Sequence, residues 1–280
     1  MSLKLENVSY VYNPDSLYET TALSDISFEI SQGETVGIIG HTGSGKSTLL
    51  QLLNGLLRPD GGSLVVAGTP ITKSSKNLAE LRKKVGLVFQ YPEYQLFEES
   101  VEKDIAFGPK NQGLSEEEIA IRVSEAMALV GLDHSYRDKS PMELSGGEKR
   151  RAAIAGVLAM KPEILMLDEP TAGLDPQGRE KLLNQLMGLK GKLTLIFISH
   201  SMEEVAKIAD RILVLSKGTL VLDKPVEEIF EEEELLREVG LDIPVVAKLF
   251  ARLREQGCDY KRNYYTLEEG LKVLLEGEDA

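Results

Sequence analysis

The 280-residue sequence has no tryptophan and a single cysteine, and only 6% of its residues are aromatic. Because Cys258 has no second cysteine to pair with, no disulfide can form within the chain, and we interpret it as an inert thiol in a reducing compartment. The sequence also lacks an apolar run of about 18 residues, the length that a membrane-spanning helix needs. Its first residues, MSLKLENVSY, lack the apolar segment of a signal peptide. Any role at a membrane is therefore expected to go through a partner.

Positive charge is scarce as well. The chain carries 32 Lys and Arg residues against 45 Asp and Glu residues, which gives a formal net charge of −13. Broad electrostatic binding to nucleic acid needs a positive surface, so we expect no nucleic-acid partner. By contrast, 42% of the residues are hydrophobic, which is enough for a packed core. The length suits one large domain, or one domain with an appendage.

The stretch GHTGSGKS, residues 40–47, lies between a short apolar run and leucines at helical spacing from Leu49 to Leu56. Gly, four residues and then Gly-Lys-Ser form the pattern of a phosphate-binding loop, in which glycines let backbone N–H groups converge on phosphate oxygens. A helix beginning near Gly45 would direct the positive end of its dipole at the same anion. Lys46 would reach the β- and γ-phosphates, and the Ser47 hydroxyl would hold Mg²⁺. The residues expected to bind the nucleotide here are Gly40, His41, Thr42, Gly43, Ser44, Gly45, Lys46, Ser47 and Thr48.

A phosphate loop needs an acidic partner for the metal ion, and ILMLDEP, residues 164–170, supplies one. The apolar residues predict a buried strand that ends at Asp168. Asp168 would hold Mg²⁺, and Glu169 would take a proton from the attacking water.

The stretch LSGGEKRR, residues 144–151, predicts a second anion site. A hydroxyl and bare backbone N–H groups stand at a helix start, and they belong to Ser145, Gly146 and Gly147. One domain has no evident use for two γ-phosphate cradles, so we expect this one to serve the nucleotide of another subunit. The basic residues 149–151 are interpreted as a solvated or intersubunit helix face.

The rest of the chain alternates strands with helices, which predicts a parallel sheet covered by helices. Residues 2–12 and 24–30 alternate like antiparallel strands, and residues 211–224 resemble a hairpin. Ser115 is expected to cap a helix, with Glu118 completing a capping box. After about residue 226 the chain is strongly acidic, but two apolar series at helical spacing predict a mostly helical appendage. Those series are Val246, Leu249, Phe250 and Leu253, and Leu267, Leu271 and Leu274.

With GHTGSGKS, LSGGE, ILMLDEP, GLD and a later SH in this order, residues 3–225 resemble the nucleotide-binding subunit of an ABC transporter. The resemblance implies an α/β fold of the P-loop NTPase class, of the ABC ATPase type. Its parts would be a RecA-like parallel-sheet core, an antiparallel β subdomain and a helical subdomain at about residues 91–158. An ABC ATPase domain would thus span residues 1–225, and residues 226–280 would form a C-terminal extension that serves dimerisation.

The same resemblance implies further site residues. Gln90 matches the Q-loop glutamine, which senses Mg²⁺ and faces the membrane partner. His200 matches the switch histidine, which contacts the γ-phosphate and the attacking water. Asp175 matches the D-loop aspartate that acts across the dimer. Tyr12 matches the aromatic residue that stacks on adenine.

The segments VFQYPEYQLFEESVEKDIAFGP and SHSMEEVA, and the tail around VGLDIPVVAKLFARLREQG, resemble the ATPases of energy-coupling-factor (ECF) vitamin and metal-ion importers. The sequences of these segments are most similar to the second ATPase of a heterodimeric pair, and a homodimer is the alternative. The resemblance implies ATP hydrolysis at the cytoplasmic face of the cell membrane, with a peripheral attachment. A transmembrane coupling subunit would dock near residues 90–104, where acidic residues follow Gln90, and a separate membrane subunit would select the cargo.

Three alternatives compete with this interpretation. Another class of ABC importer would share the same motifs. A soluble ABC protein acting on DNA or ribosomes would need a long coiled coil or a second such domain, and neither pattern is visible. A GTPase or small-molecule kinase would leave LSGGE unexplained.

Overall fold

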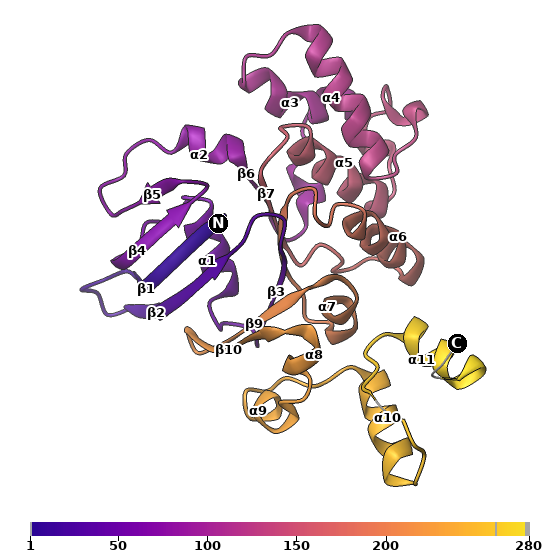
Figure 1. Ribbon diagram of the computed structural model, residues 1–280. Coiled ribbons are helices and arrows are strands. Elements are labelled where there is room, and N and C mark those ends of the chain that lie inside the picture. Colours follow the sequence, from indigo (N-terminus) through magenta and orange to yellow (C-terminus); the bar gives the residue numbers. More distant parts are fainter. Residues whose placement is uncertain (1, 261, 278–280) are drawn as a thin grey trace.

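The computed structural model describes residues 2–260 and 262–277. In Figure 1 a four-stranded antiparallel sheet lies beside a six-stranded sheet, a lobe of helices stands above them, and the C-terminal helices project at the lower right. The antiparallel sheet has the order β2-β1-β4-β5, and its strands are β1 (Leu3–Tyr12), β2 (Thr20–Ile30), β4 (Gly61–Val66) and β5 (Thr69–Ile71).

The larger sheet has the order β10-β9-β3-β8-β7-β6. Its strands are β3 (Thr35–Ile39), β6 (Val85–Val88), β7 (Ile164–Asp168), β8 (Thr194–Ile198), β9 (Arg211–Ser216) and β10 (Thr219–Pro225). All neighbours pair in parallel except β9 and β10, which form the predicted hairpin through Lys217 and Gly218. The predicted α/β class, with a parallel core and an antiparallel subdomain, is confirmed.

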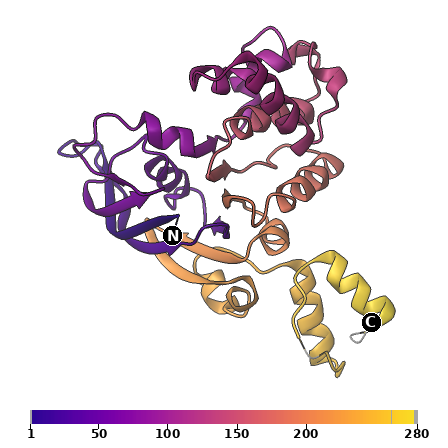
Figure 2. The same cartoon turned by 45° about the horizontal axis from the view of Figure 1, so that its top comes forward.

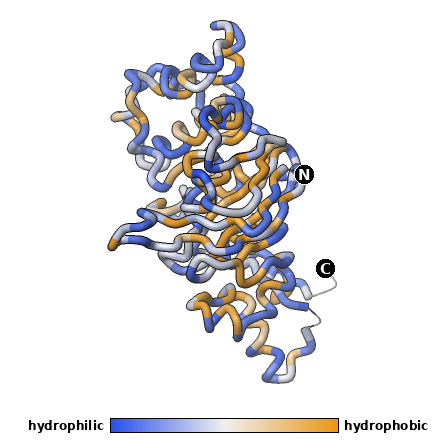
Figure 3. Tube along the Cα trace, turned by 90° about the vertical axis from the view of Figure 1, so that its left-hand side faces the viewer, coloured by the Kyte–Doolittle hydropathy of each residue, from blue (hydrophilic) through white to orange (hydrophobic). Residues whose placement is uncertain are grey.

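Both faces of the larger sheet are buried, as its near-continuous apolar runs require. On β8, Leu195 and Phe197 pack into one core with α6 (Pro176–Met187) and α7 (Met202–Ile208). The alternate residues, Ile196 and Ile198, pack into the other core with α1 (Lys46–Leu53) and the antiparallel sheet. Figure 3 shows hydrophobic residues gathered along the middle of the molecule. The expected leucine series runs past the helix, because α1 ends at Leu53 and Leu56 is 46% exposed.

The helical lobe contains α3 (Val101–Asn111), α4 (Glu116–Leu129) and α5 (Gly146–Leu158), and α2 (Ala79–Lys84) precedes β6. Short 3₁₀ helices lie at η1 (Pro92–Gln95), η2 (His134–Tyr136) and η3 (Pro141–Glu143). The Ser115 hydroxyl caps α4, as expected, by accepting from the Glu118 N–H. The Glu118 carboxylate does not complete a capping box, because it accepts from Arg122 at 2.7 Å.

The C-terminal extension comprises α8 (Val226–Ile229), α9 (Glu233–Glu238), α10 (Val245–Glu255) and α11 (Leu267–Glu276). The first two helices pack into the ATPase core, to which α10 adds Ala247, and α10 and α11 also enclose a small core of their own around Phe250. Figure 2 shows these two helices projecting from the body. The second predicted apolar series does lie on α11, but its side chains are exposed to solvent and form an apolar surface. They are Leu267, Leu271 and Leu274.

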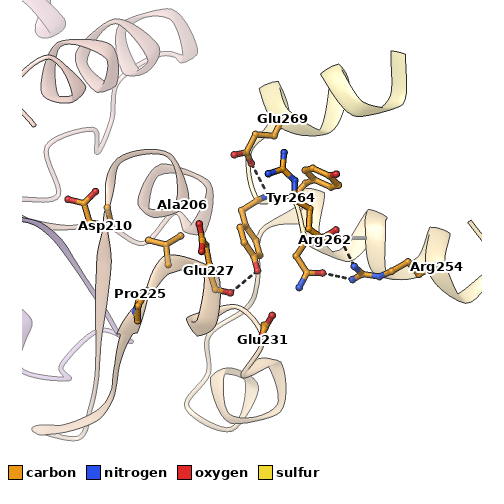
Figure 4. Close-up of a pocket in the computed structure, with 13 residues that line it drawn as sticks. Ala206, Asp210, Pro225, Glu227, Glu231, Arg254, Arg262, Tyr264 and Glu269 are labelled. Atoms are coloured by element: carbon orange, nitrogen blue, oxygen red, sulfur yellow. Dashed lines mark hydrogen bonds between the residues drawn. The ribbon is translucent and has the colours of Figure 1, made fainter. Parts of the chain in front are cut away.

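The extension is also bonded to the helix that follows His200. Lys207 of α7 lies 2.9 Å from Glu268 of α11 and also pairs with Glu180 of α6. The N–H of Val245, at the start of α10, donates to Glu203 of α7 at 3.3 Å. A pocket of about 720 Å³ lies beside this junction, where Tyr265 donates its hydroxyl to the Glu227 carbonyl (Figure 4).

A full capping box sets the start of α5. The Ser145 hydroxyl accepts from the Glu148 N–H, while the Glu148 carboxylate accepts from the Ser145 N–H at 2.8 Å. Tyr136 donates its hydroxyl to the other carboxylate oxygen at 2.6 Å. The Tyr136 hydroxyl, with the hydroxyl and N–H of Ser145, lowers the pKa of Glu148 from 4.5 to about 2. The position of Ser145 therefore depends on an ionised Glu148.

We predict that Glu148→Gln lowers the free energy of unfolding by about 1 kcal/mol at neutral pH, the usual worth of a helix cap. The folded pKa lies below the ordinary value, so the carboxylate contributes stability above about pH 4.5 that is lost as the pH falls toward 2. Denaturant unfolding should therefore show the difference between the two proteins shrinking as the pH enters that window. Glu117→Gln, on the exposed side of α4, is the control. A difference that stays constant with pH would contradict the prediction.

Candidate functional site

The phosphate loop joins β3 to α1, and two of its glycines have no room for a side chain. A Cβ at Gly40 would come within 2.3 Å of the Leu215 carbonyl oxygen, and one at Gly45 within 2.6 Å of the Ala22 oxygen. Gly45, with φ at 103°, is the N-cap residue of α1 and brings no side chain to the first N–H groups of the helix. Those N–H groups are therefore available to an anion.

Lys46 is buried and lies over its own loop, where its Nζ donates to the carbonyl oxygens of Gly40 at 2.7 Å and His41 at 2.9 Å. Burial lowers the pKa of Lys46, while the nearby carboxylates of Glu169 and Asp168 act in the opposite direction. The ammonium group is thus held at the centre of the loop next to two carboxylates.

A pocket of about 610 Å³ opens beside the loop and brings together most of the predicted nucleotide and catalytic residues. Its lining comprises Tyr12, Thr20, Thr21, Ala22, Thr42, Gly43, Gly45, Lys46, Ser47, Thr48, Gln90, Glu169 and His200. Tyr12 lies at its wall, with its hydroxyl 3.2 Å from the Thr48 hydroxyl. Gly40, His41 and Ser44 do not line this pocket, but they belong to the same loop, where the carbonyl oxygens of Gly40 and His41 accept from Lys46.

Glu169 lies at the meeting point of three strand ends. The Gln90 amide, just past β6, donates to one carboxylate oxygen of Glu169 at 2.8 Å. His200, just past β8, places Nε2 2.8 Å from the other oxygen. Glu169 itself follows β7 with φ at 50°, a conformation that L-residues with side chains seldom adopt. Strain of this kind clusters at functional sites.

Asp168 is buried at the end of β7, and this burial raises its pKa, opposed by a hydrogen bond with the Ser47 side chain. Ser47, Asp168 and Gln90 thus present a hydroxyl, a carboxylate and an amide on adjoining segments. Oxygen donors of this kind fit Mg²⁺, which prefers hard oxygen ligands and few protein groups.

The other predicted residues line a separate pocket of about 690 Å³. Ser145, Gly146 and Gly147 lie at the start of α5, and Asp175 caps α6 by accepting from the Gly178 N–H at 2.7 Å. Two helix N-termini therefore open into one pocket, which suits an anion. These residues therefore lie together, in a pocket that holds none of the phosphate loop.

The sequence predicts a solvated or intersubunit helix face for residues 149–151, and the solvated alternative is wrong at two positions. Arg151 is buried, and Arg150 is only 2% exposed and pairs with Glu93. Two of the acids expected near Gln90 to face a partner are also turned inward. These are Glu93, which pairs with Arg150, and Asp104. The Asp104 carboxylate accepts from the N–H groups of Phe97 and Glu98 at 3.2 Å each.

Sequence reasoning missed Glu204, which is buried on α7 one turn after His200. Its carboxylate accepts from the hydroxyls of Ser199 at 2.6 Å and Thr171 at 2.8 Å, and Arg179 lies 3.3 Å away. This carboxylate connects the segments before His200 and after Glu169. An acid on the apolar face of a helix that includes Val205 was the signal that could have revealed it.

Comparisons with known proteins agree with this geometry. A model of the ABC transporter family matches residues 23–172. The chain is 54% identical to the energy-coupling factor transporter ATP-binding protein EcfA2 of Clostridium tetani, over 99% of this chain and 97% of that protein. It is 48% identical to EcfA2 of Streptococcus pneumoniae serotype 2, over 99% of this chain and 100% of that protein.

Two solved structures share the fold. The structure of cbiO1 from Clostridium perfringens, described as part of the ABC transporter complex cbiONQ, matches with a TM-score of 0.76 and 39% identity, over 91% of this chain and 98% of that chain. The ATP-binding cassette MJ0796, in a dimeric post-hydrolysis state with ADP and phosphate, matches with a TM-score of 0.71 and 28% identity, over 80% of this chain and 98% of that chain.

Across residues 2–260 and 262–277, no helix combines the length and apolarity needed to cross a bilayer. The chain belongs to the family of energy-coupling factor transporter ATP-binding proteins, which are ATPases of the ABC transporter type.

Proposed function

We propose that this chain hydrolyses Mg²⁺-ATP at the cytoplasmic face of the cell membrane and thereby powers uptake of a vitamin or a transition-metal ion. The observation that carries the proposal is the pocket in which the phosphate loop, Gln90, Glu169 and His200 face one another. The curated relatives named EcfA2, which match over almost the whole chain, support the choice of importer.

The residues of the pocket have distinct roles in this proposal. The loop N–H groups and Lys46 bind the β- and γ-phosphates, and Tyr12 stacks on adenine. Mg²⁺, held by Ser47, Asp168 and Gln90, would neutralise charge on the phosphate oxygens. Glu169 accepts the proton of the attacking water, because its carboxylate faces the phosphate loop across the pocket in which the γ-phosphate would lie.

His200 and Gln90 both contact that carboxylate, so they fix its direction within the pocket. His200 would turn toward the γ-phosphate side of the pocket when nucleotide is bound. Gln90 joins the base to the segment that follows β6, which is the part of the chain proposed to meet the membrane partner.

The second pocket is proposed to receive the nucleotide of another ATPase subunit. Ser145, Gly146 and Gly147 would contact its γ-phosphate through the start of α5, and Asp175 would act across the same interface. We propose a heterodimer, because the curated relatives carry the name of a second ATPase. A homodimer is the alternative outcome when the chain is purified alone.

Glu169→Gln is expected to retain ATP binding and to lose hydrolysis by about 10²- to 10⁴-fold, the worth of a general base. The glutamine keeps the size and one acceptor oxygen of the side chain but has no carboxylate to accept a proton. Nucleotide binding, phosphate release and a dimer trapped by ATP are measured together. Glu163→Gln, which alters an exposed ion pair with Lys84 just before β7, is the control. Turnover equal to that of the unaltered protein would show that Glu169 is not the base.

The docking surface for the transmembrane coupling subunit is proposed to be the exposed aromatic patch after Gln90. Tyr94 is 84% exposed and Phe97 is 65% exposed. The Phe97 ring meets that of Phe107 edge to face at 5.0 Å, which extends the patch onto α3. Because monomeric proteins seldom leave such clusters uncovered, the patch supports a protein partner. Glu98 and Glu99 lie beside it and would pair with basic residues of that partner.

Phe97→Ser combined with Glu98→Lys should weaken assembly with the membrane subunits by at least about tenfold, since aromatic anchors dominate interface energies. Hydrolysis by the soluble ATPase pair should persist, because neither residue lines the nucleotide pocket. Leu129→Ser, at an apolar residue of α4 that is 42% exposed, is the control for loss of surface hydrophobicity. Normal recovery of the membrane subunits in a pull-down with the double variant would rule out this surface.

The extension is proposed to stabilise the ATPase dimer through the apolar face of its last two helices. Leu275 is 82% exposed and Leu271 is 47% exposed, although both belong to a well-capped helix. Val245 and Leu249 of α10 are exposed as well. An amphipathic helix needs a surface on which to bury such a face, and the second ATPase offers one.

Leu271→Glu with Leu275→Glu is expected to convert the nucleotide-free dimer to monomers without unfolding the chain, because neither leucine is buried in it. Sedimentation velocity gives the association state, and circular dichroism checks the fold. Lys272→Glu, on the same helix, is the control for added negative charge. If the double variant associates without ATP as strongly as the unaltered chain, the extension has another role.

A further inference from the structure

Arg150, on α5, has an unusual place for an arginine, because it is only 2% exposed. A buried guanidinium needs partners for its N–H groups, since an unpaired buried charge is strongly destabilising. Its Nε and Nη2 donate to the two carboxylate oxygens of Glu93, at 3.1 and 2.7 Å. Its Nη1 donates to the carbonyl oxygens of Pro170, at 3.1 Å, and Ala172.

These partners come from two segments that have separate roles in the proposed function, and Arg150 itself belongs to a third. Glu93 belongs to η1, directly after Gln90 and inside the segment proposed to meet the membrane partner. Pro170 and Ala172 follow the catalytic Glu169 without a break. Arg150 itself stands on the helix that begins with Ser145. One side chain thus joins the docking segment, the segment after the base and the helix that faces the other subunit's nucleotide.

The two loops that Arg150 joins are both strained next to the point of contact. Tyr91 has φ at 55° and Glu169 has φ at 50°, and such backbone persists only where surrounding contacts hold it. The Tyr91 ring also lies 5.9 Å from the guanidinium carbon of Arg150. A displacement of η1 would therefore move the Arg150 guanidinium, which also donates to the carbonyl oxygens of Pro170 and Ala172 after Glu169.

We propose that Arg150 is the positioning residue that transmits docking of the membrane partner to Glu169 and to the start of α5. The inference rests on the proposed docking of that partner after Gln90. Arg150 acts through its ion pair with Glu93. Lysine cannot reproduce this pair, because it lacks the two parallel N–H groups of the guanidinium. Arg150 lies outside the pocket of the phosphate loop, although it lines the second pocket, so its effect falls on the coupling of hydrolysis to uptake rather than on ATP binding at the chain's own phosphate loop.

The test compares Arg150→Lys and Glu93→Gln with the unaltered chain in two settings, the soluble ATPase pair and the full complex in liposomes. Hydrolysis, substrate uptake and KM for ATP are measured in each. Uptake per ATP hydrolysed is expected to fall by about 2- to 30-fold in both variants, the range found for residues that carry coupling. The affinity of the chain's own phosphate loop for ATP should stay unchanged, since neither residue lines that pocket. Because both variants break the same link, the double variant should be no worse than either single one.

A further variant guards against simple misfolding. Arg150→Met combined with Glu93→Met removes both charges together, and replacing a buried ion pair by apolar residues often leaves stability unchanged. This protein should fold, bind ATP and join the complex, yet lose uptake per ATP as the single variants do. Arg122→Lys, which alters an ion pair with Glu118 elsewhere in the same lobe, is the matched control and should keep normal uptake.

Two results would overturn the proposal. One is normal uptake per ATP in the Arg150→Met, Glu93→Met protein. The other is an equal loss of hydrolysis in the soluble pair and in the complex, which would make Arg150 a support of the catalytic loop alone. Failure of the docking proposal itself would be distinguishable, because Phe97→Ser with Glu98→Lys would then leave assembly normal.

Discussion

Burial of the larger sheet on both faces is the constraint on which the rest of this molecule depends. Alternate residues of β8, such as Phe197 and Ile198, enter opposite cores, so the strand is apolar after its first residue, Thr194. Polar groups gather where the parallel strands end, and the strand order then decides which of them become neighbours. The adjacent strands β3, β8, β7 and β6 deliver in turn the phosphate loop, His200, Glu169 and Gln90. The contacts of the Glu169 carboxylate with His200 and Gln90 follow from that order.

On the proposed function, helix starts supply a second set of groups for the phosphates. Ser145 and Asp175 are both N-cap residues, and both open into the pocket that lies apart from the phosphate loop. On the proposed function, each subunit supplies a phosphate loop to one nucleotide and helix N-termini to another. The capping box at Ser145 links this arrangement to local stability, because the hydroxyl that would meet a phosphate also holds the first turn of α5 together. Position and stability are thereby set by the same few hydrogen bonds.

The motif residues and the α/β class could be predicted because their signals are local. A glycine loop, an apolar run ending in acids and a helix start are each complete within about ten residues. Arg150 and Glu93 could not be recognised in this way, since they lie 57 residues apart and each looks like an ordinary surface charge. Asp104 was misread for the same reason, because its partners are backbone N–H groups across a turn. For Leu267 and Leu271 the helical period was correct, but periodicity does not tell which surface a face will cover.

The bonds between the extension and α7 have a mechanical consequence. Lys207 connects α7 to α6 and α11 at once, and Glu203 holds the first turn of α10. A helix joined at both of these points transmits rotation instead of absorbing it. A movement of the segment that begins with His200 would therefore either move α10 and α11 with it or break the Lys207–Glu268 ion pair and the Val245–Glu203 hydrogen bond. Because α10 and α11 project from the body, a small rotation of α7 would displace their far ends more than their attached ends.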